Sequence, residues 1–305
     1  MRIGVDFGGT KIEAAVVGDD GAFVARRREP NPGAYEPAIQ TVARLIAAVE
    51  TETGAGGPVG VAAPGSLSPT RGVMRNANST WLNGRPLPQD LEQALGRPVR
   101  LANDANCLAL SEAIDGAGAG RPVVFAIIVG TGCGGGVAVN GTLVDGAHGV
   151  AGEWGHAPLP WPSAKEAPGP ACWCGLHGCL ETWVSGSGLQ RDHLERTGRP
   201  LTAEGIVAAA RAGEPDASRS LDLCIDRLGR AMAMVVNLID PDAFVLGGGL
   251  SNVDELYDAL PAIVQRYAFT DVWNGVVAPA RWGDSSGVRG AARLWPSPNQ
   301  QETAA

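Results

Sequence analysis

Short hydrophobic runs separated by glycine-rich or acidic turns open this chain. Residues 2–7 (RIGVDF) predict a buried strand, and residues 12–17 (IEAAVV) predict a second one after the turn GGTK. The sequence Asp19-Asp20-Gly21 is typical of a hairpin turn, and it leads into a third predicted strand at 22–27. The start of the chain therefore predicts three consecutive strands with a glycine turn between the first two.

The same pattern returns at residues 123–144. An apolar run at 123–129 is followed by the turn GTGCGGG, a strand, an Asn140-Gly141 hairpin turn and another strand. Two unrelated hairpins could look alike, but five elements in the same order favour an internal duplication of supersecondary structure. We expect one copy in each of two domains.

Helices and further strands are predicted in the rest of the chain. The spacing of apolar residues predicts helices at 36–50, 104–115 and 221–239, and short apolar runs predict strands at 58–63, 99–102 and 242–249. Five prolines within 157–171 predict a loop, and the tail at 296–305 is expected to be disordered.

Length and composition limit the class of protein. The chain has 305 residues, of which 45% are hydrophobic, and this suits two domains with a core each. A formal net charge of −8 argues against binding to nucleic acid or to an anionic membrane, which rests on basic patches. Asp6 interrupts the first apolar run, and the longest apolar stretch, 122–139, contains glycines that predict a turn between two strands. We therefore expect a soluble, cytoplasmic protein with no nucleic-acid or membrane partner.

The first glycine turn carries residues suited to binding phosphate. Consecutive backbone amides around Gly8 and Gly9 can form a nest for an anion. Thr10 adds a hydroxyl, Lys11 adds a positive charge, and Asp6 at the strand end could hold Mg²⁺ through water. The segment matches neither of the two common glycine-rich nucleotide motifs, and an ordinary hairpin turn is the alternative interpretation.

Two later glycine clusters have the same character. The second turn contains Gly130, Thr131, Gly132 and Gly134, and the third cluster contains Gly248 and Gly249. The third cluster ends a predicted strand and could let an adenine ring lie flat against the backbone. Each cluster alone could be a simple tight turn. Phosphate-type turns at equivalent positions of two duplicated domains, however, suggest a nucleotide in the cleft between them.

The pair Asn103-Asp104 follows a short predicted strand and opens a predicted helix. A carboxylate at this place can act as the general base for a hydroxyl nucleophile, as phosphoryl transfer requires. Asn and Asp are also the best helix N-caps, so a purely structural role is an equally open interpretation.

One histidine and three cysteines predict a metal site. Cys172, Cys174 and Cys179 lie within eight residues, and with His156 they make a closed tetrahedral set for a structural Zn²⁺. Unliganded buried cysteines are the alternative, and His177 competes with His156 although it lies between two of the ligands. A closed site leaves no position for a reacting water, which argues against a zinc hydrolase.

A carboxylate near this cluster is a candidate ligand for a sugar. Glu181 follows Cys179 closely, and anchored by a metal loop it would suit hydrogen bonding to sugar hydroxyls. A solvated glutamate at the start of a helix is the alternative interpretation.

Four motifs together resemble the ROK family (repressors, open reading frames, kinases) of sugar kinases. They are DFGGTK at 6–11, VGTGCGGG at 129–136, GEWGH at 152–156 and CWCGLHGCLE at 172–181. The resemblance implies an actin-like, ribonuclease-H-like ATPase fold of two α/β domains joined by a hinge, with a zinc-binding loop at 156–181. It implies a first domain at 1–117, completed by a C-terminal helix at about 286–297, and a larger second domain at 118–285.

The resemblance also implies roles for individual residues. Asp104 matches the catalytic base, and the sugar ligands match Gly65, Asn78, Asn103, Asp104, Glu153, His156 and Glu181. The residues matching the ATP site are Asp6, Gly8, Gly9, Thr10, Lys11, Gly130, Thr131, Gly132, Gly134, Gly248 and Gly249, and the zinc ligands match His156, Cys172, Cys174 and Cys179. ATP with Mg²⁺ and a structural Zn²⁺ are the implied cofactors, and a homodimer is the implied assembly.

Within the family, several segments are most similar to bacterial fructokinases. These segments lie at 76–84, 100–113, 151–161 and 283–292. They imply transfer of the ATP γ-phosphate to the 6-hydroxyl of D-fructose, giving fructose 6-phosphate, with mannose or glucose as secondary substrates. A kinase for N-acetylglucosamine, N-acetylmannosamine or glucose is the nearer alternative, and a non-catalytic sugar sensor is the further one. Family repressors carry a helix-turn-helix before the first motif, which here starts at residue 6, so we expect no DNA-binding domain.

Overall fold

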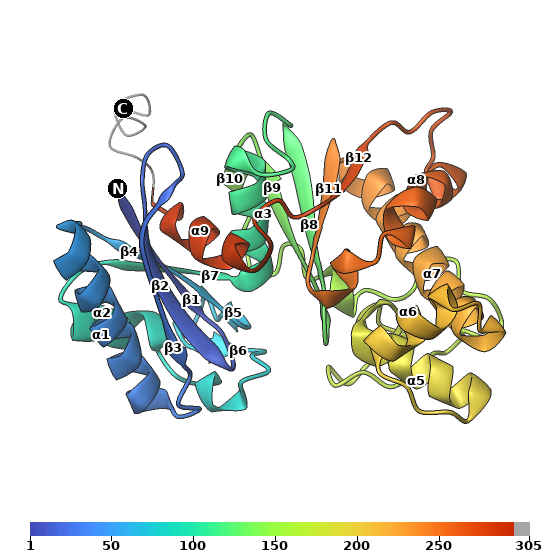
Figure 1. Cartoon of the computed structure of the whole chain (residues 1–305), viewed down its shortest axis with the longest axis horizontal. Coiled ribbons are helices and arrows are strands. Elements are labelled where there is room, and N and C mark those ends of the chain that lie inside the picture. The colour runs from blue at the N-terminus through green and yellow to red at the C-terminus, as the bar shows by residue number, and fades with distance from the viewer. Residues whose placement is uncertain (296–305) are drawn as a thin grey trace.

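Two five-stranded sheets form the frame of the protein, and they lie side by side in Figure 1. The computed structural model describes residues 1–295. The expected disordered tail and the last two residues of the C-terminal helix predicted to reach 297 lie outside these residues. Among the helices of the described part, none is both long and apolar enough to cross a bilayer.

The first sheet has the strand order β3-β2-β1-β4-β7. Its strands are β1 (Arg2–Phe7), β2 (Lys11–Val17), β3 (Phe23–Pro30), β4 (Val59–Ala63) and β7 (Val99–Asn103). The first three strands run antiparallel, and β1, β4 and β7 run parallel to one another. A separate two-stranded sheet pairs β5 (Ser66–Leu67) with β6 (Met74–Arg75).

The second sheet repeats this topology with the strand order β10-β9-β8-β11-β12. Its strands are β8 (Val123–Val129), β9 (Cys133–Val139), β10 (Thr142–Leu143), β11 (Ala243–Gly247) and β12 (Val276–Pro279). Again three antiparallel strands are followed by two parallel additions. The matched order agrees with the duplication predicted from the repeated strand-and-turn pattern.

Helices cover both faces of each sheet. They are α1 (Tyr35–Thr53), α2 (Leu87–Leu95), α3 (Asp104–Asp115), α4 (Glu181–Val184), α5 (Gly186–Thr197), α6 (Ala203–Arg211), α7 (Pro215–Ile239), α8 (Glu255–Tyr267) and α9 (Ser286–Ala292). In Figure 1, α1 and α2 flank the first sheet, α5 to α8 lie beyond the second, and α3 and α9 lie between the two sheets. Alternation along β8 sends Phe125 and Ile127 into one core and Val124 and Ala126 into another, because successive side chains of a strand point to opposite faces.

The helices α3 and α9 pack against each other where the two sheets meet. α3 packs on β8 and β9 of the second sheet, whereas α9 packs on β1 and β4 of the first. Glu112 of α3 is fully buried, and its carboxylate accepts hydrogen bonds from the Arg281 backbone N–H (3.0 Å) and the Ser286 hydroxyl (3.0 Å). This carboxylate therefore ties α3 to the segment that leads back to the first sheet. The domain boundary expected near residue 117 stays a prediction.

The second glycine turn is shorter than the sequence predicts. We expected a turn over 130–136, but β9 begins at Cys133, so three of these glycines belong to the strand. The reason is a close approach of backbones, since a Cβ on Gly136 would lie 2.5 Å from the carbonyl oxygen of Ala105 at the start of α3. Glycine in this strand lets the first turn of α3 rest directly on the second sheet.

Candidate active site

The candidate residues of the first sheet gather at the carboxyl ends of its parallel strands. Asp6 is the last residue but one of β1, Gly65 follows β4, and Asn103 ends β7 just before Asp104. In the second sheet, Gly130 and Gly248 follow the parallel strands β8 and β11 in the same way. Ligands of open α/β sheets bind outside the carboxyl ends of the strands, so this arrangement suits a ligand site.

Gly65 occupies a position that only glycine fits. Its φ of +82° lies in the left-handed region, and a Cβ would lie 2.5 Å from the Arg75 carbonyl oxygen. The Gly65 carbonyl accepts a hydrogen bond from the Asn103 side chain (3.0 Å). Asn78, expected in the same sugar-contacting loop, is exposed, and its side chain accepts a hydrogen bond from the Ser79 backbone N–H (2.7 Å). Gly65 and Asn103 are therefore hydrogen-bonded to each other, whereas the Asn78 side chain bonds within its own loop.

Asn103 and Asp104 share the start of α3. The side chains of both residues accept a hydrogen bond from the Ala105 backbone N–H, each at 2.8 Å. Asn103 can therefore cap the helix alone, and Asp104 keeps a second carboxylate oxygen for another partner. Although part of the residue Asp104 is exposed, the surrounding protein desolvates its carboxylate. This desolvation, aided by the negative charge of Glu153, raises the pKa of Asp104 despite the hydrogen bond from Ala105.

Four carboxylates form a chain of electrostatically coupled groups across the site. Desolvation and the charge of Asp104 raise the pKa of Asp6 to about 6. Desolvation also raises the pKa of Glu153, which feels the attraction of His156 and Arg75 and the repulsion of Glu181. Such a row accepts hydrogen bonds from several hydroxyl groups and attracts cations.

The glycine turns of the two sheets have different neighbours. In the first turn, Lys11 Nζ lies 3.4 Å from the exposed carboxylate of Asp284, a weak pair that leaves the lysine free to move. Asn31 donates a hydrogen bond to the Gly8 carbonyl (2.7 Å) and holds this turn in place. In the second turn, the Gly130 carbonyl accepts a hydrogen bond from the Gly186 backbone N–H (2.7 Å), at the start of α5. The exposed candidates Gly9, Thr10, Thr131, Gly248 and Gly249 remain open to a ligand.

Glu181 is held on the second sheet through both carboxylate oxygens. Its Oε2 accepts a hydrogen bond from the Cys133 backbone N–H (3.1 Å), and its Oε1 accepts one from the Trp173 indole N–H (2.6 Å). The segment with Glu153 and His156 is fixed beside it, because the Trp154 indole N–H donates to a carbonyl of β9 (3.0 Å). These bonds hold Glu181 and the segment that carries Glu153 against the same strand, β9.

The four predicted metal ligands lie together. One ligand atom from each of His156, Cys172, Cys174 and Cys179 can be chosen so that all lie within 4.8 Å of one another. The distance from Cys172 Sγ to His156 Nδ1 is 3.6 Å, and that between the sulfurs of Cys174 and Cys179 is also 3.6 Å. Tetrahedral Zn²⁺ with thiolate ligands separates neighbouring ligand atoms by about 3.8 Å, so the donor set fits a structural zinc ion. His177 is exposed and lies outside this cluster.

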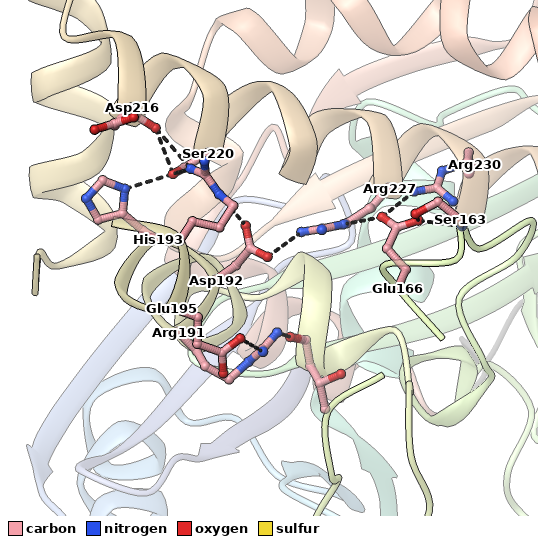
Figure 2. A network of polar contacts seen from close by, with 12 residues as sticks. Ser163, Glu166, Arg191, Asp192, His193, Glu195, Asp216, Ser220, Arg227 and Arg230 are labelled. Carbon is pink, nitrogen blue, oxygen red and sulfur yellow. Dashed lines mark hydrogen bonds and ion pairs between the residues drawn. The ribbon is translucent and has the colours of Figure 1, made fainter. Parts of the chain in front are cut away.

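A buried ion-pair network anchors the proline-rich part of the zinc loop. Figure 2 shows Glu166 facing two arginines of α7, with Arg227 Nε at 2.8 Å and Arg230 Nη2 at 2.9 Å. The Ser163 backbone N–H donates to the same carboxylate (2.9 Å), and Arg227 continues to Asp192 of α5 (3.2 Å). Burial alone would raise the pKa of Glu166, but these hydrogen bonds and charges hold it at about 2.

Glu166→Gln is expected to destabilise the protein at neutral pH by roughly 3 kcal/mol, because it removes the negative charge that two buried guanidinium groups share. The wild-type carboxylate stabilises the fold fully above its unfolded pKa of 4.5, and this contribution is lost as pH falls toward 2. The difference in urea stability between the two proteins should therefore shrink between pH 7 and pH 3, without vanishing, because pH 3 still lies above the folded pKa. Glu195→Gln, which breaks an exposed pair with Arg191 in the same region, is the control and should change stability by less than about 0.5 kcal/mol. Equal stability of Glu166→Gln and wild type at pH 7 would contradict this role.

Sequence reasoning did not single out three residues that matter for this site. They are Arg75, whose charge acts on Glu153, Trp173, which contacts Glu181, and Glu166 of the network. The position of Trp173 between two predicted metal ligands could have drawn attention to it, whereas Glu166 and Arg75 belong to no recognisable motif.

Comparison with known proteins identifies the family and corrects the expected substrate. The model of the ROK family matches residues 2–297. The chain is 39% identical to an N-acetyl-D-glucosamine kinase of Pasteurella multocida (strain Pm70), over 97% of this chain and 99% of that protein. It is 40% identical to N-acetylgalactosamine kinase AgaK of Shewanella sp. (strain ANA-3), over 96% of each. The crystal structure of a ROK hexokinase from Thermus thermophilus is also similar, with a TM-score of 0.88 and 34% identity, covering 100% of this chain and 99% of that one.

The expected fructokinase activity is wrong in the light of these relatives, which are kinases of N-acetylated amino sugars. The segments that suggested fructose lie around Asp104, Glu153 and the start of α9. They carry the predicted base and the predicted hydroxyl ligands, and this similarity did not identify the class of sugar. The full-length matches show that the chain belongs to the ROK family of two-domain α/β sugar kinases.

Proposed function

We propose that this protein phosphorylates an N-acetylated amino sugar at its 6-hydroxyl, with N-acetylglucosamine as the preferred substrate and Mg²⁺-ATP as the phosphoryl donor. The position of Asp104 carries the catalytic part of the proposal. Asp104 directly follows the last strand of the first sheet and opens a helix that packs on the second. One of its oxygens is not used by the hydrogen bond from Ala105. The names of the relatives support the class of sugar.

The transfer needs only positioning and one proton acceptor. The sugar 6-oxygen forms a bond to the γ-phosphorus as the bond from phosphorus to the β,γ-bridging oxygen breaks, and ADP leaves. The hydroxyl proton passes to Asp104, whose raised pKa makes it a better acceptor than an ordinary carboxylate. A base in this position contributes roughly 10²–10⁴-fold to the rate.

The glycine turns are the proposed ATP site. The amides at Gly8 to Thr10 and at Gly130 to Gly132 would bind phosphates, with Lys11 released from its exposed pair with Asp284. The third cluster, with Gly248 and Gly249, would accept the adenine. Asp6 would hold Mg²⁺ directly or through water, and its pKa of about 6 leaves it largely ionised at neutral pH.

The sugar is proposed to bind between Asn103 and the carboxylates of the second lobe. Glu153 and Glu181 accept hydrogen bonds from sugar hydroxyls, and His156 can offer its second ring nitrogen while Nδ1 faces the cysteine sulfurs. The zinc ion would fix the loop that carries His156 and precedes Glu181. Closure of the lobes over the sugar would exclude water, which otherwise competes as phosphoryl acceptor.

ADP release from zinc-replete protein tests this proposal with a panel of sugars. The panel contains N-acetylglucosamine, N-acetylgalactosamine, N-acetylmannosamine, glucose and fructose. The highest kcat/KM is expected with N-acetylglucosamine, and 6-deoxy-N-acetylglucosamine should bind without being phosphorylated because it lacks the attacking oxygen. Preference for glucose would contradict the amino-sugar assignment. No ADP release with any of the five sugars would contradict the kinase activity and favour a sugar sensor.

A further inference from the structure

Trp173 contacts two residues of the proposed sugar site although it lies on an exposed loop. Its indole N–H donates a hydrogen bond of 2.6 Å to Glu181 Oε1. Its ring packs edge-on against the His156 ring, with centroids 4.8 Å apart and planes at 89°. The residue nevertheless keeps 64% of its surface exposed. A tryptophan this exposed gains little from burial, so its two specific contacts call for another explanation.

The contact with Glu181 completes the immobilisation of that carboxylate. One oxygen is held by the Cys133 backbone N–H and the other by the Trp173 indole. An ionised carboxylate offers about four acceptor positions, so these two bonds leave roughly one free position on each oxygen. Glu181 is thus oriented to receive two hydroxyl groups, and less side-chain entropy is lost when the sugar arrives.

The contact with His156 acts on the second proposed ligand. An edge-to-face contact favours one orientation of an imidazole ring, whose rotation about its last side-chain bond is otherwise broad. Trp173 supplies none of the four metal ligand atoms. Its indole contacts Glu181 and the His156 ring, two of the proposed sugar ligands.

We propose that Trp173 is a positioning residue for sugar binding, acting through Glu181 and His156. This inference rests on the proposed function of the site. The indole N–H keeps the Glu181 carboxylate in its binding orientation, and the ring keeps the His156 imidazole beside it.

The substitution Trp173→Phe tests the inference, because it removes the N–H donor and retains an aromatic ring. We expect the KM for the sugar to rise about tenfold, as the loss of one hydrogen bond to a charged acceptor predicts. The KM for ATP, kcat at saturating sugar and the zinc content should stay within twofold of wild type. Trp173→Ala, which also removes the contact with His156, should raise the KM further. Calorimetric titration with sugar in the absence of ATP should show the same order.

The matched control is Trp161→Phe. Trp161 is also exposed and lies on the same loop, but its ring packs on Tyr267 (centroids 5.2 Å apart) and touches neither proposed ligand. It should leave the KM for the sugar unchanged. An unchanged sugar affinity in Trp173→Phe would overturn the inference, and so would weakened binding accompanied by loss of zinc, which would indicate a structural role. Failure of the proposed function looks different, since wild type itself would then phosphorylate no sugar of the panel or would prefer glucose.

Discussion

Asp104→Asn is expected to lower kcat by roughly 10²–10⁴-fold while sugar binding in the absence of ATP changes little. The amide keeps the shape of the side chain and can still accept a hydrogen bond from the Ala105 N–H, but it cannot take the proton of the attacking hydroxyl. Asn103 continues to cap α3, so the helix should form as before. Single-turnover kinetics and calorimetric titration with N-acetylglucosamine measure the two effects separately.

Asp19→Asn provides the control for this experiment. Asp19 is an exposed acidic residue of the turn between β2 and β3, and its replacement should leave kcat unchanged. If Asp104→Asn retained the kcat of wild type, Asp104 would not be the catalytic base and would have only a structural role at the start of α3. If it lost sugar binding in parallel with turnover, the residue would be a ligand and not the base.

Cys174→Ser is expected to reduce the zinc content from about one ion per chain to nearly none and to lower the unfolding temperature markedly. Structural zinc contributes about 10–16 kcal/mol of binding free energy in small zinc-finger peptides, so the loop at 156–181 loses a large stabilising term. Loss of sugar phosphorylation should follow, because the loop carries His156 and leads directly into Glu181. Elemental analysis, calorimetry and activity measured on one preparation would establish this order of effects.

His177→Ala is the matched control for the zinc ligand. His177 lies between two of the cysteines but is exposed and stands outside the ligand cluster, so this variant should keep its zinc and its stability. A Cys174→Ser protein that held zinc and folded normally but had lost activity would show that the cluster takes part in the reaction itself.

Local sequence patterns account for the strands of both glycine-turn repeats and for three of the helices, whereas α2, α5, α6 and α8 were not predicted. The strands β1, β4, β7 and β8 and the helix α3 lie within one or two residues of the ranges expected from apolar periodicity and from the Asn103 cap. The length of the second glycine turn could not be predicted in this way. It depends on the carbonyl of Ala105 approaching Gly136, a contact between segments about 30 residues apart, which local periodicity does not register.

In the candidate site as well, residues in short motifs could be predicted from the sequence, and residues paired over long sequence separations could not. Asp104 and the metal ligands stand in short motifs whose spacing carries their chemistry, and the structure brings the four metal ligands together. Glu166 meets Arg227 across 61 residues, and that pairing leaves no local trace in the sequence. The class of sugar was predicted wrongly, because the recognisable motifs carry the predicted base and hydroxyl ligands and no residue among them was tied to an N-acetyl group.

The helix α3 carries the candidate base at its first residue and packs on α9 where the two sheets meet, so it can act as a rigid lever between these two places. Asp104 stands at one end, and Glu112 is clamped to the Arg281–Ser286 segment about 12 Å further along the helix axis. A tilt of about 5° at the clamp displaces the Asp104 carboxylate by about 1 Å, and a misplacement of that size can cost about 100-fold in rate. We therefore expect changes in this segment, nearly 180 residues away in sequence, to shift the carboxylate of the proposed base.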